Sequence, residues 1–242
     1  MDRAPVDRGP WIPDDIKAED LNPAALHELK TLPEGLAERI ARYLVAADQA
    51  LMAGDLAAAR EFTKAAKARA GRVAVVREAA GTTAYLDGDY EAAMADLKAA
   101  RRMSGSDECL PMIADCERGL GKPQKAVALV KEGLDALAAR KHRDPELKVE
   151  LLLVGAGARA DMGQIEAGVV MLHVPELKAL PAGSVRARLQ YAYADLLERA
   201  GREREAAEWM AKAAESDIED VTDARERLGL DDEDDIVFLD GE

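Results

Sequence analysis

The sequence predicts an all-α fold in which about five helical hairpins stack into a solenoid, with a capping segment at each end. Alanine provides 48 of the 242 residues and aromatic residues only 4%. This composition favours closely packed helices, because alanine is the best helix former and strands prefer β-branched and aromatic residues. Glycines also recur between apolar, helix-forming stretches at intervals near the length of one hairpin, which indicates a repeat architecture.

Five glycines anchor the predicted hairpins, each at the turn between two helices. They are Gly54, Gly88, Gly121, Gly163 and Gly201, separated by 34, 33, 42 and 38 residues. Small residues stand seven positions before and five positions after each anchor. The two columns are Ala47, Gly81, Ala114, Ala156 and Ala194, and Ala59, Ala93, Ala126, Gly168 and Ala206. Because antiparallel helices approach closely only where side chains are small, these columns predict the contact within each hairpin.

Two further columns are predicted to fill the seam between successive hairpins. Nine positions after the anchors stand Thr63, Leu97, Val130, Leu172 and Met210, and twelve positions after them stand Ala66, Ala100, Gly133, Pro175 and Ala213. The two longer intervals contain insertions, at residues 138–145 and 174–184. We expect the first to extend a helix that breaks at Asp144-Pro145, and Ser184 to be the N-cap of the helix after the second.

The clearest copy of the turn is Leu86–Ala93, where Gly88-Asp89-Tyr90 joins the two helices. This pattern resembles the tetratricopeptide repeat, which has a period of about 34 residues. Five copies can be placed, at residues 40–73, 74–107, 107–140, 149–182 and 187–220. The usual early aromatic residue occurs only as Tyr43 and the usual closing proline is absent, which leaves the helix boundaries open. The resemblance implies a right-handed α-solenoid.

A wider resemblance covers nearly the whole chain. The stretch 77–106, its continuation through 110–121, the opening Pro10-Trp11-Ile12-Pro13-Asp14 and the acidic end are similar to an uncharacterised tetratricopeptide-repeat family of actinobacteria. This resemblance implies the same fold and brings no established activity.

We expect three segments: an N-terminal arm with a short capping helix (1–32), the repeat domain (33–229) and an acidic, disordered tail (230–242). Asn22-Pro23 is a favourable helix start, since asparagine caps helices and proline fits the first helical position. Trp11 and Ile12 are expected to dock on the first helices as a cap; alternatively, the arm fills a binding groove and inhibits it. A last helix near residues 219–228 is expected to cap the array by burying Val221, Ala224 and Leu228.

The last twelve residues, 231–242, contain seven acidic residues and no basic one, interrupted by Ile236-Val237-Phe238-Leu239. We interpret them as a solubilising tail. The alternative is a short motif that folds onto a partner or onto the protein's own basic face.

Composition and residue types disfavour several functions. A net charge of −14 makes nucleic acid an unfavourable partner. Cys109 and Cys116, about 10 Å apart along a helix, are too distant for a disulfide and are expected to be buried free thiols. We predict no metal, no cofactor and, without a nucleophile–base set, no enzymatic activity. The opening residues are polar and the sequence contains no apolar run of about 18 residues, so we expect no signal peptide and a soluble cytoplasmic protein without a membrane partner.

In tetratricopeptide arrays the first helices of the hairpins line a concave groove that accepts a peptide, so the resemblance implies a protein-interaction scaffold or adaptor. The positions that face this groove correspond here to Leu44, Asp48, Met52, Glu78, Thr82, Tyr85, Asp115, Arg118, Tyr191 and Asp195, with Leu51 and Glu198 beside them. The set is largely acidic and lacks the Lys/Arg/Asn clamp of the carboxylate-binding chaperone type. We therefore expect a basic or amphipathic partner segment, and we expect Tyr85→Ala to weaken its binding without unfolding the protein.

A second candidate surface is basic. It comprises Lys64, Lys67, Arg69, Arg72, Lys98, Arg101 and Arg102, continuing to Lys122 and Lys125. These residues are predicted to lie at the ends and outer faces of second helices, where solvated side chains with local ion pairs are the simplest interpretation. The alternative function is a ridge that binds RNA or an acidic partner and is gated by the acidic tail.

Overall fold

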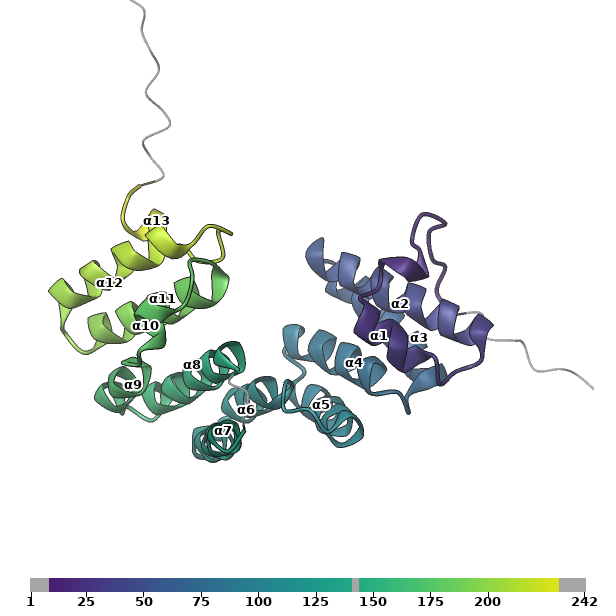
Figure 1. Ribbon diagram of the computed structural model, residues 1–242, viewed down its shortest axis with the longest axis horizontal. Helices are drawn as coiled ribbons and strands as arrows, with labels where there is room; N and C mark the ends of the chain where they lie inside the picture. The colour runs from purple at the N-terminus through teal and green to yellow at the C-terminus, as the bar shows by residue number, and fades with distance from the viewer. Residues whose placement is uncertain (1–8, 141–143, 231–242) are drawn as a thin grey trace, which may run out of the picture. The chain divides into compact units, whose positions relative to one another are not determined.

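The computed structural model describes residues 9–140 and 144–230, and the regular elements in these ranges are all helical (Figure 1). None of the described helices is long and apolar enough to cross a membrane. The expected acidic tail beyond Leu230 lies outside the described residues. The elements are η1 (Ala18–Asp20), α1 (Pro23–Leu29), α2 (Glu34–Met52), α3 (Leu56–Ala70), α4 (Ala74–Leu86), α5 (Tyr90–Ser104), α6 (Leu110–Gly119), α7 (Pro123–Ala138), α8 (Pro145–Asp161), α9 (Ile165–Leu172), α10 (Glu176–Ala179), α11 (Ser184–Arg199), α12 (Glu203–Ser216) and α13 (Ala224–Arg227).

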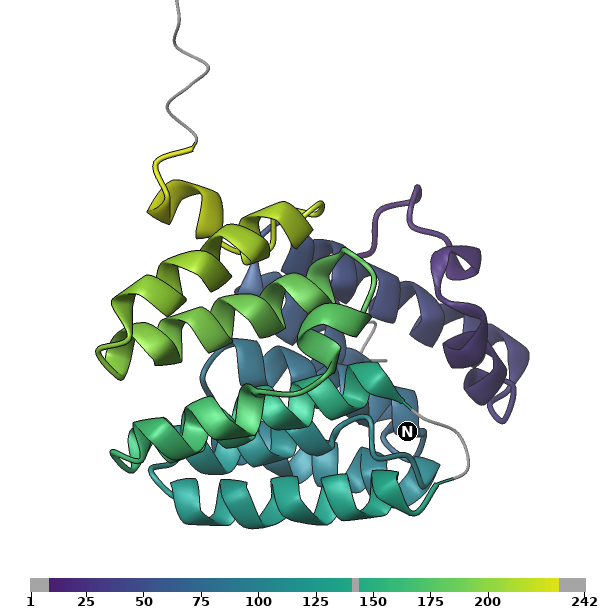
Figure 2. The ribbon, with the colours of Figure 1, turned by 60° about the vertical axis from the view of Figure 1, so that its left-hand side comes forward.

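The helices pack into two compact units, Met1–Lys122 and Pro123–Glu242. In the first unit, α2 pairs with α3 and α4 with α5, while α3 packs on α4 and α5 on α6. In the second unit, α8 packs on both α7 and α9, and α11 pairs with α12. The hairpin of α11 and α12 is seen side by side in both views (Figure 1, Figure 2). The predicted all-α hairpin repeat is therefore confirmed.

The five predicted turns share one backbone structure. Each anchor glycine has a positive φ, between 71° at Gly121 and 76° at Gly88 and Gly201. In each turn the residue after the glycine donates its backbone N–H to the carbonyl oxygen five residues back, as Asp89 does to Ala84 over 2.9 Å. This is the bond of a Schellman cap, whose left-handed residue is usually glycine. Asp55 and Asp89 then cap the next helix through their side chains.

The small-residue columns are buried, as close packing within a hairpin requires. All five residues seven before the anchors and all five residues five after them are buried. A Cβ added to Gly81 on α4 would lie 2.7 Å from Leu97 Cγ on α5, so the pair of helices has no room for a larger residue. The column nine after the anchors is also buried. Pro175 is the exception in the column twelve after, because it is exposed in the second insertion.

The N-terminal segment packs around α2. Asn22 caps α1 as predicted, with its Oδ1 accepting from Ala25 N over 2.8 Å. Ile16 is buried against Val45, and Ile12 packs at the edge of the same cluster. Trp11 does not dock as expected, because 76% of its surface is exposed. Ile16, rather than the predicted Trp11, is therefore the buried apolar side chain that holds the N-terminal segment on α2.

Three expectations about the insertions and the C-terminal cap were wrong. The first insertion does not extend a helix, because α7 ends at Ala138, although Asp144 caps α8 where the break was predicted. Ser184 is the first residue of α11 and makes no side-chain cap; its backbone N–H donates to Glu219 Oε1 over 3.3 Å. The last helix is shorter than expected. Ala224 is buried in it, whereas Val221 stays 44% exposed.

Candidate protein-binding surface

Most of the predicted groove residues lie on three helices of the first unit, α2, α4 and α6. These residues, which we call the inner row, are Asp48 and Met52 on α2, Glu78, Thr82 and Tyr85 on α4, and Asp115 and Arg118 on α6. Residues three and four apart lie on one side of a helix, which places the three α4 side chains in a single stripe. Helix α4 packs against both α2 and α6. The stripe on α4 is therefore the middle of the surface.

Leu44 does not belong to this surface. Its exposed fraction is only 4%, and it shares a core cluster with Leu29 of α1. Helix α1 covers this part of α2, and it also reaches α4, where Glu28 Oε2 accepts from Val75 N over 3.0 Å. Val73, at the N-cap position of α4, makes no side-chain cap, so Glu28 satisfies one of the free N–H groups of the first turn. This contact was not predicted from the sequence.

Hydrogen bonds order the inner row between α4 and α6. Tyr85 Oη donates to Asp115 Oδ2 over 2.6 Å, and Arg118 Nη1 donates to Asp115 Oδ1 over 2.7 Å. Burial, followed by the bond to Asp115, raises the pKa of Tyr85, so the hydroxyl keeps its proton at neutral pH. Thr82 Oγ1 lies 3.8 Å from Met112 Sδ. Tyr85, Asp115 and Arg118 therefore form a fixed group of polar side chains within the row.

Glu78 lies in an acidic environment at the other end of the stripe. Its carboxylate is half-buried and has no hydrogen-bonding or basic partner among the described residues. Burial raises the pKa of Glu78, and the charges of Glu108 and Glu28 raise it further. Burial and the same acidic neighbourhood also raise the pKa of the Cys109 thiol to about 12. A cation placed here would relieve the repulsion among the carboxylates.

The predicted groove residues of the second unit are already engaged by its capping helix. Arg227 of α13 donates to Tyr191 Oη over 3.0 Å and lies 3.6 Å from Asp195 Oδ1. It also pairs with Glu198 and stacks over the Tyr191 ring at 5.4 Å. These side chains hold α13 in place, and sequence position alone did not reveal their partner.

Four residues of the predicted basic surface are engaged with neighbours within the first unit. Lys67 and Arg77 both bind Asp96, over 2.5 and 2.7 Å, and the Asp96 side chain is only 4% exposed. Lys98 pairs with Glu117 and Arg101 with Asp107. Arg69 stacks over Tyr43 and donates to a backbone carbonyl oxygen. Lys64, Arg72 and Arg102 remain without partners among the described residues.

An outer cleft of about 720 Å³ lies over the Asp96 pairs, between α3, α4 and α5. Arg60, Lys64, Lys67 and Arg77 line it, but Arg60 pairs with Asp87 and Asp89, as the other two pair with Asp96. Lys64 is thus the one lining cation left without a partner in the described part of the chain. Structural ion pairs therefore line most of this cleft, and Lys64 supplies its one free charge among the described residues.

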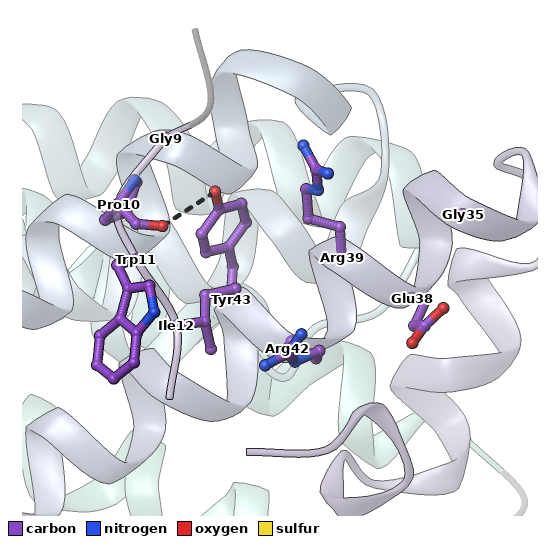
Figure 3. A pocket seen from close by; sticks show the side chains of 9 residues that line it. All are labelled: Gly9, Pro10, Trp11, Ile12, Gly35, Glu38, Arg39, Arg42 and Tyr43. Atoms are coloured by element: carbon purple, nitrogen blue, oxygen red, sulfur yellow. Dashed lines mark hydrogen bonds between the residues drawn. The ribbon is translucent and has the colours of Figure 1, made fainter. Parts of the chain in front are cut away.

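A second pocket, which the sequence did not predict, lies between the N-terminal segment and the first half of α2. We call it the N-terminal pocket; it measures about 480 Å³ and is lined by Gly9, Pro10, Trp11, Ile12, Gly35, Glu38, Arg39, Arg42 and Tyr43 (Figure 3). Tyr43 Oη donates to the Pro10 carbonyl oxygen over 3.4 Å and ties the segment to α2. The signal in the sequence was Trp11 itself, an aromatic residue in a polar, proline-rich arm.

No candidate metal site accompanies these surfaces in the described residues. Within 9–140 and 144–230, no group of three or more His, Cys, Asp or Glu side chains could hold a metal ion. Cys109 and Cys116 are free and buried, as the sequence predicted. Burial raises the pKa of the Cys116 thiol to about 11.

Comparison with known proteins supports the fold. No family model and no curated protein matches the sequence. Solved structures do match. A thermophilic TPR protein of Thermus thermophilus aligns with a TM-score of 0.62 and 19% identity over 78% of this chain and 97% of its own. Nearly identical TPR-like repeats from Podosopora anserina align with a TM-score of 0.56 and 15% identity over 78% and 97%.

The Rap conjugation gene regulator of plasmid pLS20, solved with the Phr* peptide, aligns with a TM-score of 0.59 and 15% identity over 75% of this chain. This chain spans 54% of that regulator's length. At such identities the similarity concerns the fold alone. Together with the five glycine turns and the buried small-residue columns, it shows that the chain adopts the tetratricopeptide-repeat fold.

Proposed function

We propose that this protein is a non-catalytic scaffold that binds a basic or amphipathic segment of a partner protein along the inner row of its first unit. The observation that carries the proposal is the half-buried Glu78 carboxylate, which lies near Glu28 and Glu108 and has no cationic partner among the described residues. A lysine or arginine of the partner would supply the missing charge. The peptide complex of the Rap regulator, which has the same fold, supports a peptide ligand.

The rest of the inner row suits a segment with both charged and apolar side chains. Met52 is 83% exposed, and methionine adapts its shape to different apolar partners. Tyr85 and Asp115 are held by mutual hydrogen bonding, so a partner that contacts them loses little additional side-chain freedom. A partially desolvated carboxylate forms a stronger charge-assisted bond than one in bulk water. Together these features favour a helical or extended peptide with basic residues beside apolar ones.

The alternative function, binding of RNA or an acidic partner by the basic ridge, finds less support. Four of its nine predicted residues, Lys67, Arg69, Lys98 and Arg101, are engaged with neighbours in the fold. Breaking these contacts to bind a polyanion would cost stability. The cations left without partners among the described residues are few for a phosphate-tracking surface; they are Lys64, Arg72, Arg102, Lys122 and Lys125.

Selection of random displayed peptides on the immobilised full chain tests the scaffold proposal. We expect enrichment of peptides that combine Lys or Arg with apolar residues, and we expect Glu78→Lys to abolish their binding. Glu91→Lys is the matched control, because Glu91 is an exposed acid in α5, outside the inner row. Enrichment of acidic peptides, or equal binding to both variants, would contradict the proposal.

A further inference from the structure

The N-terminal pocket combines an exposed aromatic ring with uncompensated positive charge. Its charged lining consists of Glu38, Arg39 and Arg42. Arg39 has no partner among the described residues. Arg42 donates to the backbone carbonyl oxygens of Ile16 and Pro13, both over 2.8 Å, so its charge meets no carboxylate. The lining therefore carries net positive charge on a chain whose overall charge is −14.

The pocket is also held in shape before any ligand arrives. The two bonds from Arg42 and the bond from Tyr43 to Pro10 fix the N-terminal segment on α2. Figure 3 shows the Trp11 ring at the edge of the pocket and the Arg39 side chain on the α2 side. A ligand thus meets a preformed wall, which lowers the entropy cost of binding. Guanidinium groups bind carboxylates in paired hydrogen bonds, and an indole face binds apolar side chains.

The chain itself carries a segment with this chemistry. Residues 231–242 include seven acidic residues, no basic residue and the apolar run Ile236-Val237-Phe238-Leu239. We propose that residues 231–242 of a second copy of this chain bind in the N-terminal pocket, with carboxylates on Arg39 and Arg42 and the apolar run against Trp11. This contact is independent of the inner row, because the pocket uses the first half of α2 and the row uses Asp48 and Met52 in its second half.

The outer cleft over Asp96 is the competing site for an acidic segment, and it is less suitable. Three of its four cations, Arg60, Lys67 and Arg77, already bind aspartates of the fold. An acidic ligand there would have to displace those carboxylates. In the N-terminal pocket Arg39 has no partner among the described residues, and Arg42 binds only backbone carbonyl oxygens.

Trp11 reports on the contact directly in the full chain. The chain has two tryptophans, so Trp209→Phe leaves Trp11 as the sole tryptophan, and acrylamide quenching of tryptophan fluorescence measures its accessibility. A segment on one face of the indole covers about half of the accessible ring, so we expect Phe238→Ser and Arg39→Glu each to raise the quenching constant about twofold. Combining the two changes should raise it no further, because both remove the same contact.

Controls and a second measurement make the result decisive. Arg102→Glu reverses the charge of another exposed, unpaired arginine of the first unit and should leave the quenching constant unchanged. The Trp209 ring packs edge-on against Tyr193 at 5.3 Å, so the comparison is repeated with 5-fluorotryptophan in a chain that keeps Trp209. There the Trp11 fluorine resonance should move when Phe238 is replaced. Unchanged quenching in both variants at low salt, with an unmoved resonance, would overturn the proposal.

Discussion

Replacing Asp96 with alanine tests whether the basic surface is structural. Asp96 joins three helices of the first unit, because its buried carboxylate on α5 binds Lys67 of α3 and Arg77 of α4. Removing one partner of a fully buried ion pair costs about 3–5 kcal/mol. Here the side chains of Lys67 and Arg77 are 40% and 31% exposed to solvent. Because both cations can regain water, we expect a loss of about 2 kcal/mol.

Amide hydrogen exchange resolved by peptide is the suitable assay, because the chain has two units and a single melting curve would mix them. A loss of about 2 kcal/mol corresponds to roughly 30-fold faster exchange in α3, α4 and α5. Asp96→Asn keeps the shape and part of the hydrogen bonding and should have about half the effect in kcal/mol. Peptides from α11 and α12 serve as the internal control. Unchanged exchange in α3–α5, or equal acceleration in α11 and α12, would refute the reasoning.

The remaining predictions concern three other features of the first unit. Glu78 has a raised pKa in the folded state, so its contribution to stability is present below the pKa of the unfolded state and is lost as pH rises through the pKa of the folded state. Glu78→Gln should therefore stabilise the protein at neutral pH by up to about 1 kcal/mol and give no gain near pH 4, as measured by urea unfolding at both pH values. Glu28→Ala removes the acceptor of Val75 N and should cost about 1 kcal/mol; faster exchange confined to the first turn of α4 checks it, and unchanged exchange would contradict it. Cys109 and Cys116, with thiol pKa values raised to about 12 and 11, should resist maleimide at about pH 8 until urea unfolds the first unit, and rapid labelling of the folded chain would show this interpretation to be wrong.

The repeat architecture was predictable because its determinants are local. A left-handed turn needs glycine, and two closely packed helices need small residues at fixed distances from that turn. Gly88 and Ala93 therefore indicate one hairpin without reference to the rest of the chain. The N-cap at Asn22 was predictable for the same reason. Ser184 was not, because the chain enters α11 through Gly183 and a distant Glu219 satisfies the first N–H.

The contacts of the candidate site were less predictable, because they join residues from neighbouring helices. Tyr85 and Asp115 are 30 residues apart, and Lys67 and Asp96 are 29 apart. Both separations are slightly shorter than the repeat length of about 34 residues, so each pair joins equivalent helices of adjacent hairpins. Complementary side chains at that spacing are a signal that the sequence contains. The coverage of Leu44 by α1 and the exposure of Trp11 have no such signal, since both depend on how the N-terminal segment packs around α2.

The most direct test of the scaffold proposal is the ionisation of Glu78 itself. Carbon-13 NMR of its side-chain carboxyl group follows the pKa in the free protein and in the presence of a selected basic peptide. A lysine or arginine bound beside Glu78 favours the charged form, so we expect the raised pKa of the free protein to fall on binding, and the bound peptide to stabilise the ionised state. A pKa that stays raised while the peptide is bound would contradict the proposal.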